Sequence, residues 1–191
     1  MFKLIAKDAR LYGLVVVDPT RIDETFQQMD RYSNHPKCVG IKTIQDLYGF
    51  GLDHSFYRPI LEKAEEKNLP VMAHIPGMLE AAQKFPKLTF VCAHSTFERV
   101  KHMFKCPNVY FDLATSHNDV SETKLERFIA EAGEDKIIFA SDGPLVDPSW
   151  TLGKLASSNI RPAQLDKILF SNALRAFPRL CSEEENQANL Q

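Results

Sequence analysis

The sequence has 191 residues, of which 44% are hydrophobic and 25% are charged, and its formal net charge is −2. These values are typical of one globular domain with a sizeable core, and the charge excludes a basic surface built for nucleic acid or for an acidic membrane. No apolar run reaches the length of a membrane span, and charged residues interrupt the amino-terminal segment where a signal peptide would be apolar. The four cysteines show no C-x-x-C spacing, which excludes a zinc knuckle and a redox pair. We therefore expect a soluble, cytoplasmic protein.

Apolar segments alternate with segments of helical periodicity along most of the chain. The six predicted strands are 11–17, 38–41, 71–74, 88–93, 109–113 and 137–140. The predicted helices between them are 22–32, 56–67, 78–84, 97–104 and 121–132, with Gly133 ending the last of these. Because strands that alternate with helices form a parallel sheet, we expect an α/β fold, either doubly wound or closed as a barrel. No glycine-rich fingerprint follows the first strand, and this argues against an open sheet of the nucleotide-binding type.

Three of the predicted strands bring a possible metal ligand to their carboxyl ends. His74 ends the segment 71–74, His94 follows 88–93, and Asp142 follows 137–140. Since the carboxyl ends of parallel strands meet at one edge, we expect the three side chains to face the same rim. Each also has an ordinary explanation, because an aspartate after a strand can cap a helix and a single histidine is most often a core residue. Together they favour a site for a divalent cation such as zinc.

Other residues near this rim are weaker candidates. Lys42 ends the strand 38–41 and could contact a substrate, or a metal if it were carboxylated, although a packed stem with a solvated head is the simpler interpretation. Asp112 lies within the strand 109–113 and is expected to form hydrogen bonds in the wall of the fold. Within the aromatic, glycine-rich loop 43–54, the segment Tyr-Gly-Phe-Gly at 48–51 could cover a substrate as a lid, or its rings could pack on the rim.

Four motifs, in this order, resemble the amidohydrolase superfamily. They are Val-Met-Ala-His-Ile at 71–75, Phe-Pro-Lys-Leu-Thr-Phe-Val-Cys-Ala-His-Ser at 85–95, Asn-Val-Tyr-Phe-Asp-Leu-Ala at 108–114 and Ile-Ile-Phe-Ala-Ser-Asp-Gly-Pro at 137–144. The segment 168–177 is also similar to the usual ending of that family. The branch that the sequence resembles most is the amidohydrolase-related group that contains the aminocarboxymuconate-semialdehyde decarboxylase-like enzymes. The resemblance extends from about residue 11 to residue 177.

The resemblance implies a TIM-type (β/α)8 barrel that binds one or two divalent metals at its carboxyl rim and acts on a small-molecule substrate. It implies that His74 is a metal ligand from the fifth strand. His94, from the sixth strand, would be a ligand or the residue that orients a metal-bound water. Asp142, from the eighth strand, would be a ligand and the general base. We expect one barrel domain over residues 1–180, a polar tail over 181–191, and no nucleic-acid or membrane partner.

The sequence departs from the family at its beginning. The family carries a His-x-His pair after its first strand, and this sequence contains none. The first predicted strand, 11–17, resembles the third strand of the family. We therefore expect an incomplete barrel of about six β-α units without the first two strands, and its exposed sheet edges make a homo-oligomer plausible. Three explanations stay open: a truncated product or mis-set start, which we favour, assembly with another chain, or a remnant without catalysis.

The main functional hypothesis is a metal-dependent hydrolase that uses a metal-activated water on an amide, ester or lactone bond. In it Asp142 acts as general base and His94 steadies the water or the developing oxyanion. A metal-dependent decarboxylase on the same scaffold is one alternative. A catalytically inactive barrel fragment is the other.

Overall fold

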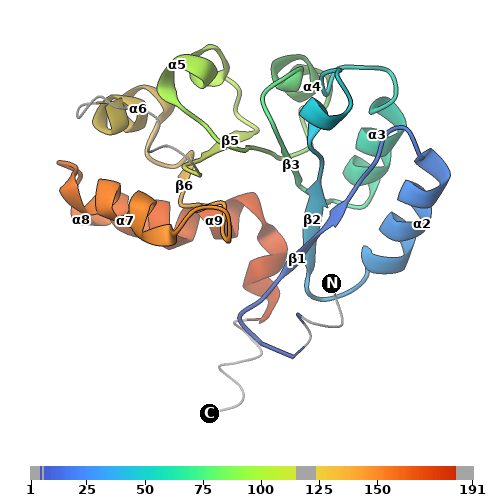
Figure 1. Ribbon diagram of the computed structural model, residues 1–191, viewed down its shortest axis with the longest axis horizontal. Coiled ribbons are helices and arrows are strands. Elements are labelled where there is room, and N and C mark those ends of the chain that lie inside the picture. The colour runs from blue at the N-terminus through green and yellow to red at the C-terminus, as the bar shows by residue number, and fades with distance from the viewer. Residues whose placement is uncertain (1–4, 6, 115–123, 184–191) are drawn as a thin grey trace.

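The computed structural model describes residue 5, residues 7–114 and residues 124–183, and these residues form a parallel α/β fold (Figure 1). Six strands make one sheet in the order β1-β2-β3-β4-β5-β6, and every neighbouring pair is parallel. The strands are β1 (Gly13–Val16), β2 (Cys38–Lys42), β3 (Val71–Ala73), β4 (Phe90–Cys92), β5 (Val109–Asp112) and β6 (Ile137–Ile138). A strand order that follows the chain is that of a TIM barrel, which has eight strands. The described residues supply six of them.

Helices connect the strands and continue after the last one. They are α2 (Ile22–Tyr32), η1 (Gln45–Leu47), α3 (Arg58–Glu66), α4 (Met78–Lys84), α5 (Phe97–Val100), η2 (Lys101–Met103), α6 (Lys124–Ala132), α7 (Pro148–Ser157), α8 (Pro162–Asp166), η4 (Lys167–Ser171), α9 (Asn172–Ala176) and η5 (Pro178–Glu183). Figure 1 shows α2 and α3 beside β1 and β2, whereas α7 and α8 lie at the other side of the molecule, beyond β6. Within the described part of the chain, no helix combines the length and the apolar character that crossing a membrane requires.

All six predicted strands exist, but their ends differ from the prediction. The strand predicted at 137–140 pairs only over Ile137–Ile138, and His74 lies just beyond β3 rather than inside it. The predicted helix 97–104 is divided into α5 and η2. Gly133 ends α6 as predicted, with φ of +92° and its N–H donating to the Ile129 carbonyl at 3.0 Å. Five of the six strands are shorter than predicted, because a parallel ladder continues only as far as both partners remain extended, and β2 is longer by Lys42.

The two faces of the sheet carry separate apolar clusters. On the outer face, strand residues such as Val71, Phe90 and Phe111 pack against helices in a large core. On the inner face, Val39, Val91 and Ile138 pack with residues of the carboxyl-terminal helices, chiefly Ala176 and Phe177. Since successive side chains of a strand point to opposite faces, the second cluster is the interior of the barrel. The end of α9 therefore fills this interior near the amino ends of the strands.

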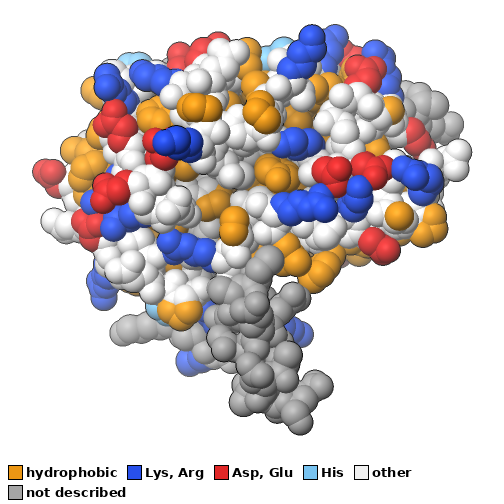
Figure 2. All heavy atoms as spheres, turned by 180° about the vertical axis from the view of Figure 1, so that it is seen from behind, with side chains coloured by type: hydrophobic (Ala, Val, Ile, Leu, Met, Phe, Trp, Pro, Cys, Tyr) orange, Lys and Arg blue, Asp and Glu red, His pale blue; other side chains and the backbone are white. Residues whose placement is uncertain are grey.

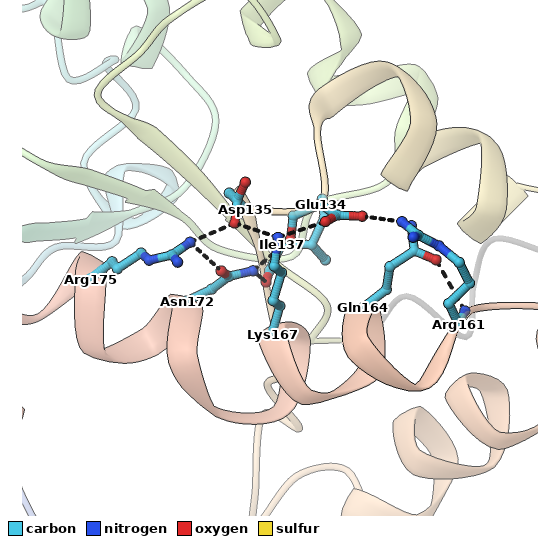
Figure 3. A network of polar contacts seen from close by, with 8 residues as sticks. All are labelled: Glu134, Asp135, Ile137, Arg161, Gln164, Lys167, Asn172 and Arg175. Atoms are coloured by element: carbon cyan, nitrogen blue, oxygen red, sulfur yellow. Dashed lines mark hydrogen bonds and ion pairs between the residues drawn. The ribbon is translucent and has the colours of Figure 1, made fainter.

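A network of polar side chains fastens the carboxyl-terminal helices to the start of β6 (Figure 3). The fully buried amide of Asn172 donates to the carbonyls of Glu134 and Ile137, both at 2.8 Å. Around it, Glu134 forms ion pairs with Arg161 and Lys167. Asp135 forms ion pairs with Lys167 and Arg175. The network holds α8, η4 and α9 against the sheet.

Two further side chains satisfy backbone carbonyls at the same end of the sheet. Arg179, from η5, donates to the carbonyls of Ser33, Cys38 and Lys67, which lie at the end of α2, the start of β2 and the end of α3. Asn108, just before β5, donates to the carbonyls of Ala82, Phe85 and Leu88 at 3.0, 3.1 and 3.0 Å.

The η5 helix extends through Glu183, beyond the predicted domain boundary at residue 180. Residues 184–191 of the predicted tail lie outside the described residues.

The outer surface carries both signs of charge. Figure 2 shows Lys and Arg side chains interspersed with Asp and Glu side chains over the face that it draws.

Candidate functional site

Five polar residues occupy the carboxyl ends of consecutive strands. Lys42 and Asp112 are the last residues of β2 and β5, and His74, His94 and Asp142 follow β3, β4 and β6. The structure thus brings the three predicted site residues to one rim. A cavity of about 390 Å³ opens at this rim. Its lining consists of Tyr12, Gly13, Leu14, Val16, Lys42, Met72, Ala93, His94, Asp112, Ala114, Ala140 and Asp142.

His74 is held by two residues of η1. The side chain of Gln45 accepts from the His74 backbone N–H at 3.0 Å and donates to the His74 carbonyl at 2.9 Å. The carboxylate of Asp46 forms a short hydrogen bond with Nδ1 of the His74 ring. A carboxylate on one ring nitrogen fixes the tautomer and directs the other nitrogen outward, as in metal-ligating histidines. Nε2 is therefore the nitrogen of His74 that is available to a ligand.

His94 is positioned by Asp112. Its backbone is left-handed, with φ of +56°, and its N–H donates to Oδ1 of Asp112 at 2.9 Å. The same oxygen accepts the N–H of Ala114 at 3.0 Å. Asp112 is only 1% exposed, and this burial raises the pKa of its carboxyl from 3.8 to about 6, against the lowering effect of the two N–H donors. The ring of His94 meets the ring of His74 edge to face, with centroids 4.9 Å apart.

Asp142 and Lys42 face the cavity as charged groups of opposite sign. Asp142 is also left-handed, with φ of +63°, and its carbonyl accepts the N–H groups of Leu145 and Val146 at 3.0 and 3.3 Å. This turn presents the Asp142 carboxylate to the cavity. Burial lowers the pKa of Lys42, while the negative charges of Asp112 and Asp142 act in the opposite direction. The left-handed backbones of His94 and Asp142 are a form of strain that clusters at functional sites.

The described residues fit a divalent cation only in part. His74 and His94 adjoin each other, and Asp142 lines the same cavity as His94. However, the part of the chain that the structure describes contains no group of three His, Cys, Asp or Glu side chains placed to hold one metal ion. A catalytic metal usually has three protein ligands. The arrangement is therefore not a complete metal site, and the ligand set His74, His94 and Asp142 stays a prediction.

Sequence reasoning missed the residues that orient the rim. Gln45 and Asp46 lie in the loop 43–54, and neither was singled out as a site residue. Their signal is weak, because a Gln-Asp pair in a loop shows no periodicity and their contacts with His74 cross almost thirty positions of the chain. The aromatic residues of this loop pack on one another, with Phe50 and His54 centroids 4.4 Å apart, and none of them lines the cavity. This favours the packing interpretation of the loop over a lid.

Several solved structures share this fold. The 5-carboxyvanillate decarboxylase from Sphingomonas paucimobilis is 16% identical, with a TM-score of 0.74 over 93% of this chain and 70% of that one. An uncharacterised TIM-barrel protein from Bordetella bronchiseptica is 18% identical, with a TM-score of 0.79 and the same coverage. A dihydroxybenzoic acid decarboxylase from a Polaromonas species, solved with manganese and the inhibitor 2-nitroresorcinol, is 17% identical, with a TM-score of 0.69 over 92% of this chain and 72% of that one.

These similarities confirm the TIM-type fold, since identities this low establish architecture rather than activity. None of the curated proteins matches the chain significantly. A family model described as Amidohydrolase matches residues 2–179, which include the whole rim. The chain therefore belongs to the amidohydrolase family.

Proposed function

We propose that the protein is a decarboxylase of the amidohydrolase family that acts on an aromatic carboxylic acid. The observation that carries the proposal is the rim cavity, where His94 and Asp142 face a space of about 390 Å³ with a largely apolar opposite wall. This volume is within the range of small-molecule sites. Support for the reaction class comes from the two similar structures that are decarboxylases of carboxyvanillate and dihydroxybenzoate. These favour the decarboxylase alternative over the hydrolase hypothesis.

The reaction needs a proton donor near the ring. When the bond between the ring carbon and the carboxylate carbon breaks, carbon dioxide leaves and its electron pair stays on the ring carbon, which must then gain a proton. We assign the delivery of this proton to Asp142, whose carboxylate would take it from solvent and pass it to the ring carbon, since no described residue forms a hydrogen bond with that carboxylate and it faces the cavity. His94, fixed by Asp112, would orient the ring. General acid catalysis of this kind contributes about 10²–10⁴ in rate.

The proposal includes a divalent cation, as in the manganese-bound Polaromonas enzyme. We assign no catalytic step to it, because the described residues do not complete a three-ligand set. The ion itself is open to measurement, with manganese and zinc as the two candidates. We expect about one equivalent of bound metal in the purified chain and less in His74→Ala, because His74 is the imidazole that a carboxylate already orients.

The direct test is release of carbon dioxide. The purified chain would be incubated with 5-carboxyvanillate or dihydroxybenzoate, with manganese or zinc present, and both carbon dioxide and ring absorbance would be followed. We expect turnover of at least one acid, and a rate about 100-fold lower in Asp142→Asn. The matched control is Asp166→Asn, which changes an exposed aspartate of α8. A folded chain that releases no carbon dioxide with either metal would contradict the proposal, and cleavage of an ester or lactone instead would favour the hydrolase hypothesis.

A further inference from the structure

Lys42 differs from the other partly buried lysines in the described part of the chain. Lys63 pairs with Asp30, Lys167 pairs with Glu134, and the ammonium of Lys136 donates to the Pro107 carbonyl. No described residue accepts a hydrogen bond or an ion pair from the ammonium of Lys42, although the side chain is more than half buried. A desolvated ammonium without a partner costs free energy. Such a group persists where a ligand supplies the missing partner.

The surroundings of Lys42 indicate the sign and shape of that ligand. The ammonium faces the same cavity as Asp112 and Asp142, whose carboxylates act on it through space without contacting it. Asp112 already accepts two backbone N–H groups, so its Oδ1 is committed to His94 and Ala114. The cavity wall formed by Leu14, Val16 and Met72 is apolar. An occupant with an apolar body and one negative charge fits this combination.

We propose that Lys42 is the carboxylate-binding residue of the cavity, and that its ammonium pairs with the carboxylate of an aromatic acid whose ring lies against Leu14, Val16 and Met72. The proposal rests on the proposed function for the substrate class. An ion pair with the substrate carboxylate stabilises the bound ground state, so it strengthens binding rather than the bond-breaking step. Lys42 therefore determines KM and selects anions over neutral compounds of the same shape.

The test compares benzoate with its neutral isostere benzamide, by titration calorimetry on the full chain. The wild-type protein is expected to bind benzoate about tenfold more tightly than benzamide, as a charge-assisted contact predicts. Lys42→Met keeps the stem and removes the charge, so it should lose the preference for benzoate. Lys42→Arg should keep most of the preference. The control is Lys101→Met, which removes only an exposed pair with Glu98 and should behave as wild type.

Two results would overturn the assignment: a preference for benzoate that survives in folded Lys42→Met, or a wild-type chain that shows no preference. Far-ultraviolet circular dichroism establishes that each variant is folded, and retention of the preference in Lys42→Arg separates loss of charge from loss of structure. The carbon dioxide assay decides the proposed function separately. Benzoate selectivity that depends on Lys42 in a chain without turnover would sustain this assignment and contradict the decarboxylase proposal.

Discussion

The two ends of the sheet treat their polar groups in opposite ways. At the amino ends of the strands, Asn108, Asn172 and Arg179 each satisfy two or three backbone carbonyls. At the carboxyl ends, the charged groups of Lys42 and Asp142 face a cavity and have no hydrogen-bonding partner among the described residues. At the amino end these side chains satisfy the hydrogen-bonding capacity of the backbone carbonyls, whereas at the carboxyl end two charged groups could pair with a ligand.

This difference assigns stability and function to separate ends of one domain. Buried polar groups that are fully satisfied hold a fold in one arrangement, whereas unpaired charges and left-handed backbones cost free energy. In TIM barrels the amino face serves stability and the carboxyl face carries the chemistry. Substitutions at the amino end should therefore destabilise the protein, and removal of a charge at the carboxyl end should stabilise it while weakening ligand binding.

The largest effect is expected for Asn172→Ala. The substitution leaves the partly buried carbonyl of Glu134 and the buried carbonyl of Ile137 without their donor, at about 2 kcal/mol each. We expect the free energy of unfolding to fall by about 4 kcal/mol, measured by urea denaturation. Asn159→Ala is the control, because this asparagine is exposed and uses only its backbone N–H, toward Glu126. A loss below about 1 kcal/mol for Asn172→Ala would show that the amino end is not held as described.

Asp112→Asn tests the buried carboxyl that positions His94. The folded-state pKa is raised from 3.8 to about 6, so the folded protein holds this proton up to a higher pH than the unfolded chain does. The stability that the proton contributes is present below about pH 4 and is lost as the pH rises to about 6. Relative to Asp112→Asn, the wild-type free energy of unfolding should fall by about 2 kcal/mol between about pH 4 and about pH 6.

Urea denaturation from about pH 4 to pH 7 measures this difference, since the other carboxylates are common to both proteins. Asp166→Asn, at an exposed position of α8, is the control and should give a curve parallel to wild type. Parallel curves for wild type and Asp112→Asn would contradict the raised pKa.

Replacing one lysine at each end of the sheet by methionine compares how the two ends contribute to the free energy of unfolding. Lys42→Met removes an unpaired ammonium, so the free energy of unfolding should rise by about 1 kcal/mol. Lys136→Met, at the amino end, removes a donor to the Pro107 carbonyl and a cation 4.6 Å from the centre of the Tyr110 ring, so the value should fall by about 1 kcal/mol. Thermal denaturation without ligand measures both. If both substitutions changed the free energy of unfolding in the same direction, the proposed difference between the two ends of the sheet would be wrong.

The smallest effect is expected away from both ends. Arg58→Met breaks an exposed ion pair with Glu62, one turn along α3, with a distance of 2.8 Å. Such pairs contribute about 0.3 kcal/mol, so the free energy of unfolding should hardly change. Repeating the measurement at high salt, which screens the pair, should erase the difference. A loss above about 1 kcal/mol would mean that surface pairs, rather than the amino-end contacts, hold the helices.

The strand positions were predictable because a buried parallel strand is a continuous apolar run, such as Val71–Ala73 or Ile137–Ile138. The rim residues His74, His94 and Asp142 were predictable because polar residues that end such runs reach the same edge of the sheet. The interior contacts of Asp112 in the wall were expected and are confirmed. The strand ends were not predictable to the residue, because they depend on the conformation of a neighbouring strand.

The amino-acid sequence by itself determined the α/β class, the succession of strands and helices along the chain and the end of the sheet at which the polar residues gather, since these follow from local periodicity and chain direction. Only the tertiary structure decided that Gln45 and Asp46 hold His74, that Asp112 holds His94, and that the ammonium of Lys42 faces the cavity. The carbonyls that Arg179 joins, from Ser33, Cys38 and Lys67, lie more than a hundred residues before it in the chain. Such contacts between distant segments depend on how the elements pack together, and no local pattern in the sequence specifies them.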